Sequence, residues 1–147
     1  MMKGKIVAVC ISDTKGVRKT PCPSGMFLED YGMANDAHAE CGINRQVSLL
    51  SVDSIEKMKN MGLSVGPGDF AENLTVTGIE LYSLIPGTKL VVGSDVILEI
   101  SQIGKTCHTG CAIFKEVGKC IMPKEGVFAK VVKGGEIRTG DEVEVVT

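Results

Sequence analysis

A cluster of thiols and cations in the last third of the sequence offers its clearest chemistry. Cys107 lies between Lys105 and His108, and two further cysteines, Cys111 and Cys120, follow. A nearby cation lowers the pKa of a cysteine and raises the fraction of thiolate, which is the form that acts as nucleophile and metal ligand. The sequence therefore indicates that Cys107 would carry any covalent or metal chemistry of this protein.

The same residues also fit a structural zinc site. Zinc is bound tetrahedrally by thiolate sulfur and imidazole nitrogen, and Cys107, Cys111, Cys120 and His108 would supply such a set. The spacing matches no familiar zinc finger, and free cysteine is often a small buried apolar side chain. Reactive thiol, zinc ligand and buried packing residue all stay open for these cysteines on spacing alone.

Four polar residues elsewhere could bind or orient a ligand. His38 is one of only two histidines, and histidine changes charge near neutral pH. Arg45 could hold a phosphate or carboxylate through its planar guanidinium. Glu72 could orient a positive partner such as Arg45 or His38. Its neighbour Asn73 could bind a ligand or satisfy loop backbone groups, the usual use of such a residue.

Composition limits the class of protein. The 147 residues are 44% hydrophobic and 23% charged, with a formal net charge of −2, which predicts one globular domain over residues 1–147. The charge gives no basic field for nucleic acid or an anionic membrane, and no run reaches the ~18 apolar residues of a membrane helix. Six cysteines without a secretion signal predict reduced thiols and a cytoplasmic protein.

Short β-branched runs separated by glycine turns predict a chain made mainly of strands. The expected strands are residues 5–11, 47–50, 73–76, 80–84, 89–92, 96–103, 127–133 and 142–146. Residues 17–23 contain two prolines and are expected to form a loop or an edge segment. Residues 25–35 lack clear periodicity, and residues 133–136 carry a hairpin turn signal.

One segment has the pattern of a helix. Ser51 or Asp53 could cap its start, apolar residues recur through Met58, and Gly62 follows as a stop signal. Many strands with a single confident helix predict a mainly β fold, either a barrel or a sandwich with small helical decorations.

Five segments, in order along the chain, resemble the MOSC domain family, named for the C-terminal domain of molybdenum cofactor sulfurase. They are Asp-Ala-His-Ala at 36–39, Arg-Gln-Val-Ser-Leu-Leu at 45–50, Gly-Asp-Phe-Ala-Glu-Asn-Leu at 68–74, Gln-Ile-Gly-Lys-Thr-Cys-His at 102–108, and Gly-Gly-Glu-Ile-Arg-Thr-Gly-Asp at 134–141. The likeness covers most of the chain, and the stretch from 107 to 123 is similar to small stand-alone bacterial members.

The resemblance implies a fold and a ligand. The fold would be a closed or partly closed β-barrel of the pyruvate-kinase-barrel type with a few short helices. The ligand would be molybdenum cofactor, a molybdopterin. Cys107 would be the functional cysteine, with residues near the same pocket at His38, Arg45, Glu72 and Asn73. Molybdenum-ion and pyridoxal-phosphate binding are further family-level expectations.

The resemblance leaves two roles for Cys107. In the leading hypothesis Cys107 carries sulfur as a persulfide for metal–sulfur centres, and Cys111 or Cys120 resolves that persulfide by thiol exchange. Arg45 and Lys105 would meet the pterin phosphate, and the partners would be a cysteine desulfurase or molybdopterin-biosynthesis proteins. In the alternative, Cys107 ligates molybdenum in an oxidoreductase that acts on N-hydroxylated compounds. Whether the protein is an enzyme stays open between these roles.

Overall fold

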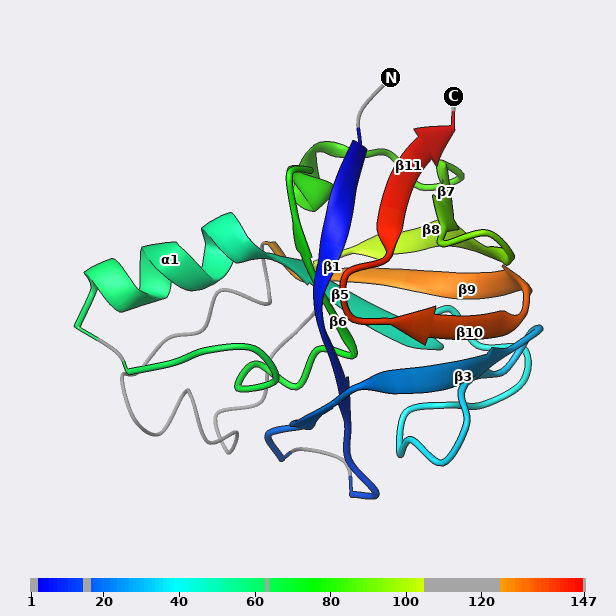
Figure 1. The fold of residues 1–147 in the computed structure, drawn as a ribbon, viewed down its shortest axis with the longest axis horizontal. Coiled ribbons are helices and arrows are strands. Elements are labelled where there is room, and N and C mark those ends of the chain that lie inside the picture. The colour runs from blue at the N-terminus through cyan, green and yellow to red at the C-terminus, as the bar shows by residue number, and fades with distance from the viewer. Residues whose placement is uncertain (1–2, 15–16, 63, 105–124, 147) are drawn as a thin grey trace.

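A computed structural model describes residues 3–14, 17–62, 64–104 and 125–146 of the chain. Within this part of the chain, a ring of strands closes into a barrel in the order β11-β7-β8-β9-β5-β6-β1, and β1 pairs with β11 to complete it (Figure 1). The barrel strands are β1 (Lys3–Ile11), β5 (Val47–Ser51), β6 (Leu74–Thr77), β7 (Lys89–Val92), β8 (Val96–Ile103), β9 (Val127–Lys133) and β11 (Glu142–Val146). The expected mainly β barrel is confirmed.

Pairing directions define one end of this barrel. β5 and β6 run parallel, and β1 is antiparallel to β6, with Val9 opposite Leu74. The carboxyl end of β1 and the amino ends of β5 and β6 therefore meet at the same end of the barrel. Loops that leave or enter there are brought together although they are far apart in sequence.

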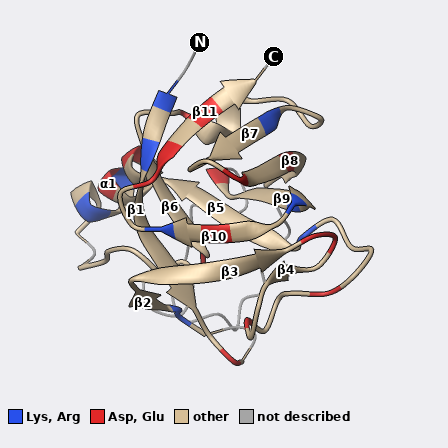
Figure 2. Cartoon of the chain, turned by 45° about the vertical axis from the view of Figure 1, so that its right-hand side comes forward, with Lys and Arg blue, Asp and Glu red and all other residues tan. Residues whose placement is uncertain are grey.

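A smaller sheet covers part of the barrel. It consists of β10 (Gly135–Arg138), β3 (Ser24–Leu28) and β4 (Gly32–Met33) in that order, and Figure 2 shows β10 and β3 running side by side. The short strand β2 (Thr20–Cys22) pairs with β1 at the edge of the main sheet. That placement agrees with the expectation of a loop or edge segment for residues 17–23.

Buried and more exposed side chains alternate along the strands, and the buried ones fill the barrel interior. In β8, Val96, Leu98 and Ile100 are fully buried, and the residues between them are partly exposed. Side chains of successive strand residues point to opposite faces, so one face of each strand enters the core. The single described α-helix, α1 (Val52–Asn60), buries Ile55 and Met58. No helix in the described ranges is long and apolar enough to cross a membrane.

Two local expectations are wrong, and one segment without a prediction contains strands. Residues 80–84 do not form a strand, because Leu81–Ser83 is a 3-10 turn, η1, whose Leu81 side chain is fully buried. Residues 25–35 hold two short strands, β3 and β4, that their irregular pattern hid. Ser51 precedes α1 but does not cap it through its side chain, since the Ser51 hydroxyl instead donates to Ile79 O at 2.8 Å.

The hairpin expected at residues 133–136 is also absent. β10 follows β9 in sequence but pairs with β3 instead, with Gly135 opposite Phe27. Gly134 passes so close to that strand that a Cβ atom would lie 2.5 Å from Phe27 O. Gly134 therefore permits a close approach of the backbone to β3, which is one of the uses of glycine near strands.

Candidate functional site

A buried lysine gathers polar side chains at the barrel end where β1 finishes. Lys19 Nζ lies 2.9 Å from Ser12 Oγ, 2.8 Å from Asp36 Oδ1 and 2.9 Å from His38 Nδ1. The side chains of Lys19 and Asp36 are 0% exposed, whereas that of His38 is 30% exposed. We call these four residues the Lys19 cluster.

Asp36 is the anionic centre of the Lys19 cluster. Besides the ammonium, its carboxylate accepts the backbone N–H of Ser12 and of His38, both at 3.1 Å. Burial by itself would raise the pKa of Asp36, but the nearby His38 side chain and the hydrogen bonds from Lys19 and Ser12 outweigh burial and hold that pKa well below its usual range. Burial lowers the pKa of Lys19, opposed by its hydrogen bond and charge interaction with Asp36.

Three separate segments supply the Lys19 cluster. Ser12 follows β1, Lys19 precedes β2, and Asp36 and His38 lie in the turn after β4. A backbone hydrogen bond holds the turn after β4 against the residue that follows β1, because Ala37 N donates to Ser12 O at 2.8 Å. The Asp36 side chain also caps the amide two residues on, as aspartate commonly does in turns. The cluster is therefore assembled by the barrel rather than by any local motif.

Glu72 holds the neighbouring loop in place. Its buried carboxylate accepts Gly68 N at 3.0 Å, Phe70 N at 3.3 Å and the Thr75 hydroxyl at 2.7 Å. Burial raises the pKa of Glu72, although these donors act in the opposite direction. Its hydrogen bonds within the described residues go to its own loop and strand, rather than to Arg45 or His38.

The loop held by Glu72 touches the Lys19 cluster through backbone. Lys19 N donates to Gly68 O at 2.8 Å. Gly68 has φ +88°, and a Cβ there would lie 2.2 Å from Lys19 O, so this position requires glycine. Lys19 thus joins the Glu72 loop through its main chain and His38 through its side chain.

Asn73 binds strands together inside the barrel end. Its side-chain oxygen accepts Ser48 N at 3.0 Å, and its side-chain nitrogen donates to Cys10 O at 3.2 Å. Its backbone carbonyl accepts Cys10 N at 2.7 Å. Asn73 is completely buried, so it links β1, β5 and β6 without facing solvent.

Arg45 lies apart from the Lys19 cluster, on an exposed surface beside β8 and β9. Its guanidinium stacks over the Phe128 ring at 5.3 Å, and Nε donates to Gln102 Oε1 at 3.3 Å. Gln102 in turn donates to Gly104 O at 2.8 Å. Gly104 is the last described residue before the segment that contains Cys107, so Arg45 is anchored at the base of that segment.

The returning end of that segment is anchored by α1. Ser54 Oγ donates to Glu125 Oε1 at 2.6 Å, and Lys57 Nζ lies 2.8 Å from Glu125 Oε2. Lys57 also lies over the Tyr82 ring at 4.9 Å. Glu125 is the first described residue after the cysteine segment, so the described residues on either side of that segment are held by side-chain contacts.

Several expected site residues fall outside the described residues. They are Lys105, Cys107, His108, Cys111 and Cys120. The reactive-thiol role, the molybdenum-ligand role and the zinc set therefore stay predictions. Within the described ranges no group of three or more His, Cys, Asp or Glu side chains could hold a metal ion.

Sequence reasoning missed most of the Lys19 cluster. Lys19 was expected to lie in a loop or edge segment, and neither Ser12 nor Asp36 was singled out as a site residue. The one available signal was the Asp-x-His spacing at 36–38, because an aspartate two residues before a histidine can cap its amide. The long-range contacts of Lys19 left no local pattern in the sequence.

The cysteines of the described residues differ sharply in environment. Cys10 is fully buried, and burial together with the charge of Glu72 raises its pKa to about 12. Burial also raises the pKa of the half-buried Cys22, and Cys41 is exposed. Cys10 therefore lacks the thiolate that covalent chemistry needs at neutral pH.

Alkylation should separate these thiols. We expect iodoacetamide at neutral pH to modify Cys41 in the folded protein and to leave Cys10 unmodified until denaturant is added, because only a solvent-accessible thiolate reacts. Peptide mass spectrometry of native and unfolded samples measures this. Labelling of Cys10 at the same rate as Cys41 in the folded protein would contradict the buried, protonated state.

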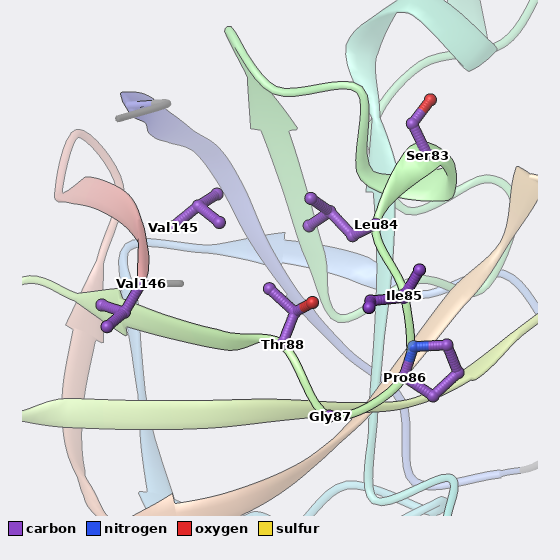
Figure 3. Close-up of a pocket in the computed structure, with 8 residues that line it drawn as sticks. All are labelled: Ser83, Leu84, Ile85, Pro86, Gly87, Thr88, Val145 and Val146. Carbon is purple, nitrogen blue, oxygen red and sulfur yellow. The ribbon is translucent and has the colours of Figure 1, made fainter.

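A surface pocket elsewhere offers no chemistry of this kind. A mainly apolar hollow of about 580 Å³ is lined by residues 83–88 together with Val145 and Val146. Figure 3 shows these lining side chains. None of its lining side chains carries a charge or titrates in the neutral range. Among the described residues, the Lys19 cluster is therefore the better candidate for a functional site.

Comparison with known proteins identifies the family of this chain. The MOSC domain family model matches residues 36–144, which is more than half of the chain. A search of curated proteins found no match. Because the family model matches most of the chain, this chain belongs to the MOSC domain family.

Solved structures share the fold at low sequence identity. The YuaD protein from Bacillus subtilis is 22% identical, with a TM-score of 0.79 over 98% of this chain and 96% of its own. YiiM from Geobacillus stearothermophilus is 18% identical, with a TM-score of 0.69 over 98% of this chain and 75% of its own. YiiM from Escherichia coli is 17% identical, with a TM-score of 0.65 over 100% of this chain and 71% of its own.

Proposed function

We propose that this protein handles molybdenum cofactor and that Cys107 serves as its persulfide carrier for metal–sulfur centre assembly. Membership of a family associated with molybdenum cofactor supports this class of ligand. The observation that carries the proposal is the joint placement of the family motifs: Lys19 links His38 to the Glu72 loop at one end of the barrel.

The second support is the position of Arg45. An exposed guanidinium held by Gln102 and Phe128 is a cation fixed in place beside the base of the cysteine segment. A pterin phosphate is anionic and pairs well with a planar guanidinium. Arg45 and the partly exposed His38 therefore fit the polar parts of such a cofactor, and Lys105 would add a second cation near Cys107.

The described residues divide into two tasks under this proposal. Glu72 and Asn73 are buried and hold backbone, so they shape the site without touching a ligand. Arg45 and His38 have exposed surface and would contact the ligand. When bound, the cofactor would supply molybdenum redox chemistry, and this chain would orient it and present the Cys107 thiolate.

Sulfur transfer to Cys107 would be a thiol exchange. The Cys107 thiolate attacks the outer sulfur of a persulfide on a cysteine desulfurase, a new S–S bond forms on Cys107, and the donor S–S bond breaks as the donor thiolate leaves. Electrons balance without an added oxidant. The thiolate of Cys111 or Cys120 would then attack the inner sulfur of the Cys107 persulfide, so that a disulfide with Cys107 forms while the S–S bond to the outer sulfur breaks and that sulfur leaves as hydrosulfide.

Cofactor retention tests the binding half of the proposal. We expect the purified chain, mixed with molybdopterin cofactor released anaerobically from a donor enzyme, to retain molybdenum and pterin through gel filtration. Arg45→Ala should weaken this binding by roughly 10- to 100-fold, because a hydrogen bond to a charged group contributes about 1.5–3 kcal/mol. Elemental analysis and pterin fluorescence measure retention.

A matched arginine serves as the control. Arg138 on β10 is also exposed and pairs with Glu136 at 2.8 Å, so Arg138→Ala removes an equal charge from a different surface. Retention by the Arg138 variant with loss by the Arg45 variant supports the site. Equal losses in both variants, or no retention by the wild-type chain, would rule it out.

A further inference from the structure

All donors of the Lys19 ammonium are occupied. An ammonium carries three N–H donors and no acceptor, and Lys19 Nζ lies within 2.9 Å of Ser12 Oγ, Asp36 Oδ1 and His38 Nδ1. The ion pair with the fully buried Asp36 favours the charged form of the lysine. His38 Nδ1 must then accept a hydrogen bond, which requires its lone pair.

That acceptor role determines the protonation of the ring. A neutral imidazole carries one proton, so a lone pair on Nδ1 places the proton on Nε2. Lys19 Nζ already occupies Nδ1 at 2.9 Å, and the His38 side chain is 30% exposed. Nε2 is therefore the nitrogen left to meet a ligand.

We infer that Lys19 is a positioning residue that fixes His38 as the neutral Nε2–H tautomer, so that His38 presents a hydrogen-bond donor to an acceptor atom of the bound molybdopterin. The ligand part rests on the proposed function, whereas the tautomer follows from the Lys19 cluster alone. His38 is thereby a donor toward an oxygen or thiolate of the ligand rather than a base.

Asp36 could stabilise the other tautomer of His38, in which Nδ1 carries the proton. Its Oδ2 lies 3.7 Å from His38 Nδ1, just beyond hydrogen-bond distance. Without the lysine ammonium, a small movement of the ring would let Nδ1–H donate a hydrogen bond to this carboxylate. Nε2 would then become an acceptor, so loss of Lys19 reverses the polarity of the nitrogen that faces the ligand.

Nuclear magnetic resonance of the imidazole nitrogens tests this inference. The chain has two histidines, so His108→Gln leaves His38 as the only imidazole in protein made without a histidine tag. Two-bond proton–nitrogen spectra, recorded above the pH range in which histidine titrates, distinguish the tautomers. We expect the Nε2–H form in this background and the Nδ1–H form after a further Lys19→Met change.

A conservative variant guards against loss of structure. Lys19→Arg keeps a cation with N–H donors and should retain the Nε2–H tautomer, and backbone amide spectra report whether each variant is folded. An Nδ1–H tautomer in the His108→Gln protein would overturn the inference even if Lys19→Met does not fold. An unchanged tautomer in folded Lys19→Met would also overturn it.

The ligand part has its own readout. Adding molybdopterin should shift the His38 Nε2 resonance and leave the tautomer unchanged, and retention with no such shift would overturn this part. Failure of the wild-type chain to retain cofactor would remove the proposed function together with the ligand part. The tautomer result would stand in that case, so the two failures are distinguishable.

Discussion

Replacing Asp36 with asparagine should lower the free energy of unfolding by about 3–5 kcal/mol, the usual cost of removing one partner from a buried ion pair. The substitution leaves the Lys19 ammonium buried without a counter-charge, since both side chains are 0% exposed. The new amide nitrogen would also face a donor, either the His38 amide or the ammonium. Urea unfolding of both proteins measures the difference.

An exposed ion pair gives the matched control. Lys3 and Glu142 lie 3.9 Å apart with side chains 57% and 63% exposed, so Glu142→Gln should change stability by at most about 1 kcal/mol. A similar small change for Asp36→Asn would contradict the account of the Lys19 cluster as a buried, fully bonded unit.

The pH dependence of the same difference follows from the lowered pKa of Asp36. A carboxyl whose pKa is lower in the folded state stabilises the fold above its ordinary pKa, here 3.8, and this stabilisation is lost as pH falls below that value. The stability gap between wild type and Asp36→Asn should therefore be full near neutral pH and narrow in acid. A gap that widens in acid would contradict the assignment.

Replacing Asn73 with alanine should also cost several kcal/mol of stability. The change leaves Ser48 N and Cys10 O without their side-chain partner inside the barrel. Each buried group left unpaired costs about 1–3 kcal/mol, so we expect a loss of about 2–6 kcal/mol. Chemical unfolding monitored by circular dichroism measures it.

This outcome decides between two uses of a family motif residue. A ligand-contacting asparagine would lower cofactor retention and leave stability nearly unchanged, whereas a strand-linking asparagine lowers stability first. Asn44→Ala is the control, because Asn44 is exposed in the loop before β5 and such changes usually stay within about 0.5 kcal/mol. Equal stability of the two variants would show that Asn73 does not link the strands.

Much of the barrel was predictable because its strands carry their own pattern. Val96, Leu98 and Ile100 alternate with less buried residues, and this period of two survives in any barrel or sandwich. The 3-10 turn at Leu81–Ser83 has the same apolar residue types as a strand, so composition did not separate the two. The closing pair of β1 with β11 joins the two ends of the described chain, and no local pattern reports such a contact.

The site was predictable only in part. Motif resemblance brought attention to His38 and Arg45, whereas the lysine that positions His38 lies in a stretch with no strand or helix pattern. Lys19 makes side-chain contacts to residues 7, 17 and 19 positions away. Its role depends on the fold of three segments, which sequence spacing does not encode. The uses of Glu72 and Asn73 in holding backbone also emerged only from their hydrogen bonds.

Sulfur loading of Cys107 is the direct test of whether this residue carries sulfur. The chain is incubated with a cysteine desulfurase, pyridoxal phosphate and cysteine, and intact and peptide mass spectrometry then locate any added sulfur. We expect a mass increase of one sulfur atom on Cys107, absent from Cys107→Ser and from buried Cys10. No adduct on Cys107, or an equal adduct on the exposed Cys41, would contradict the proposal that Cys107 is the sulfur carrier.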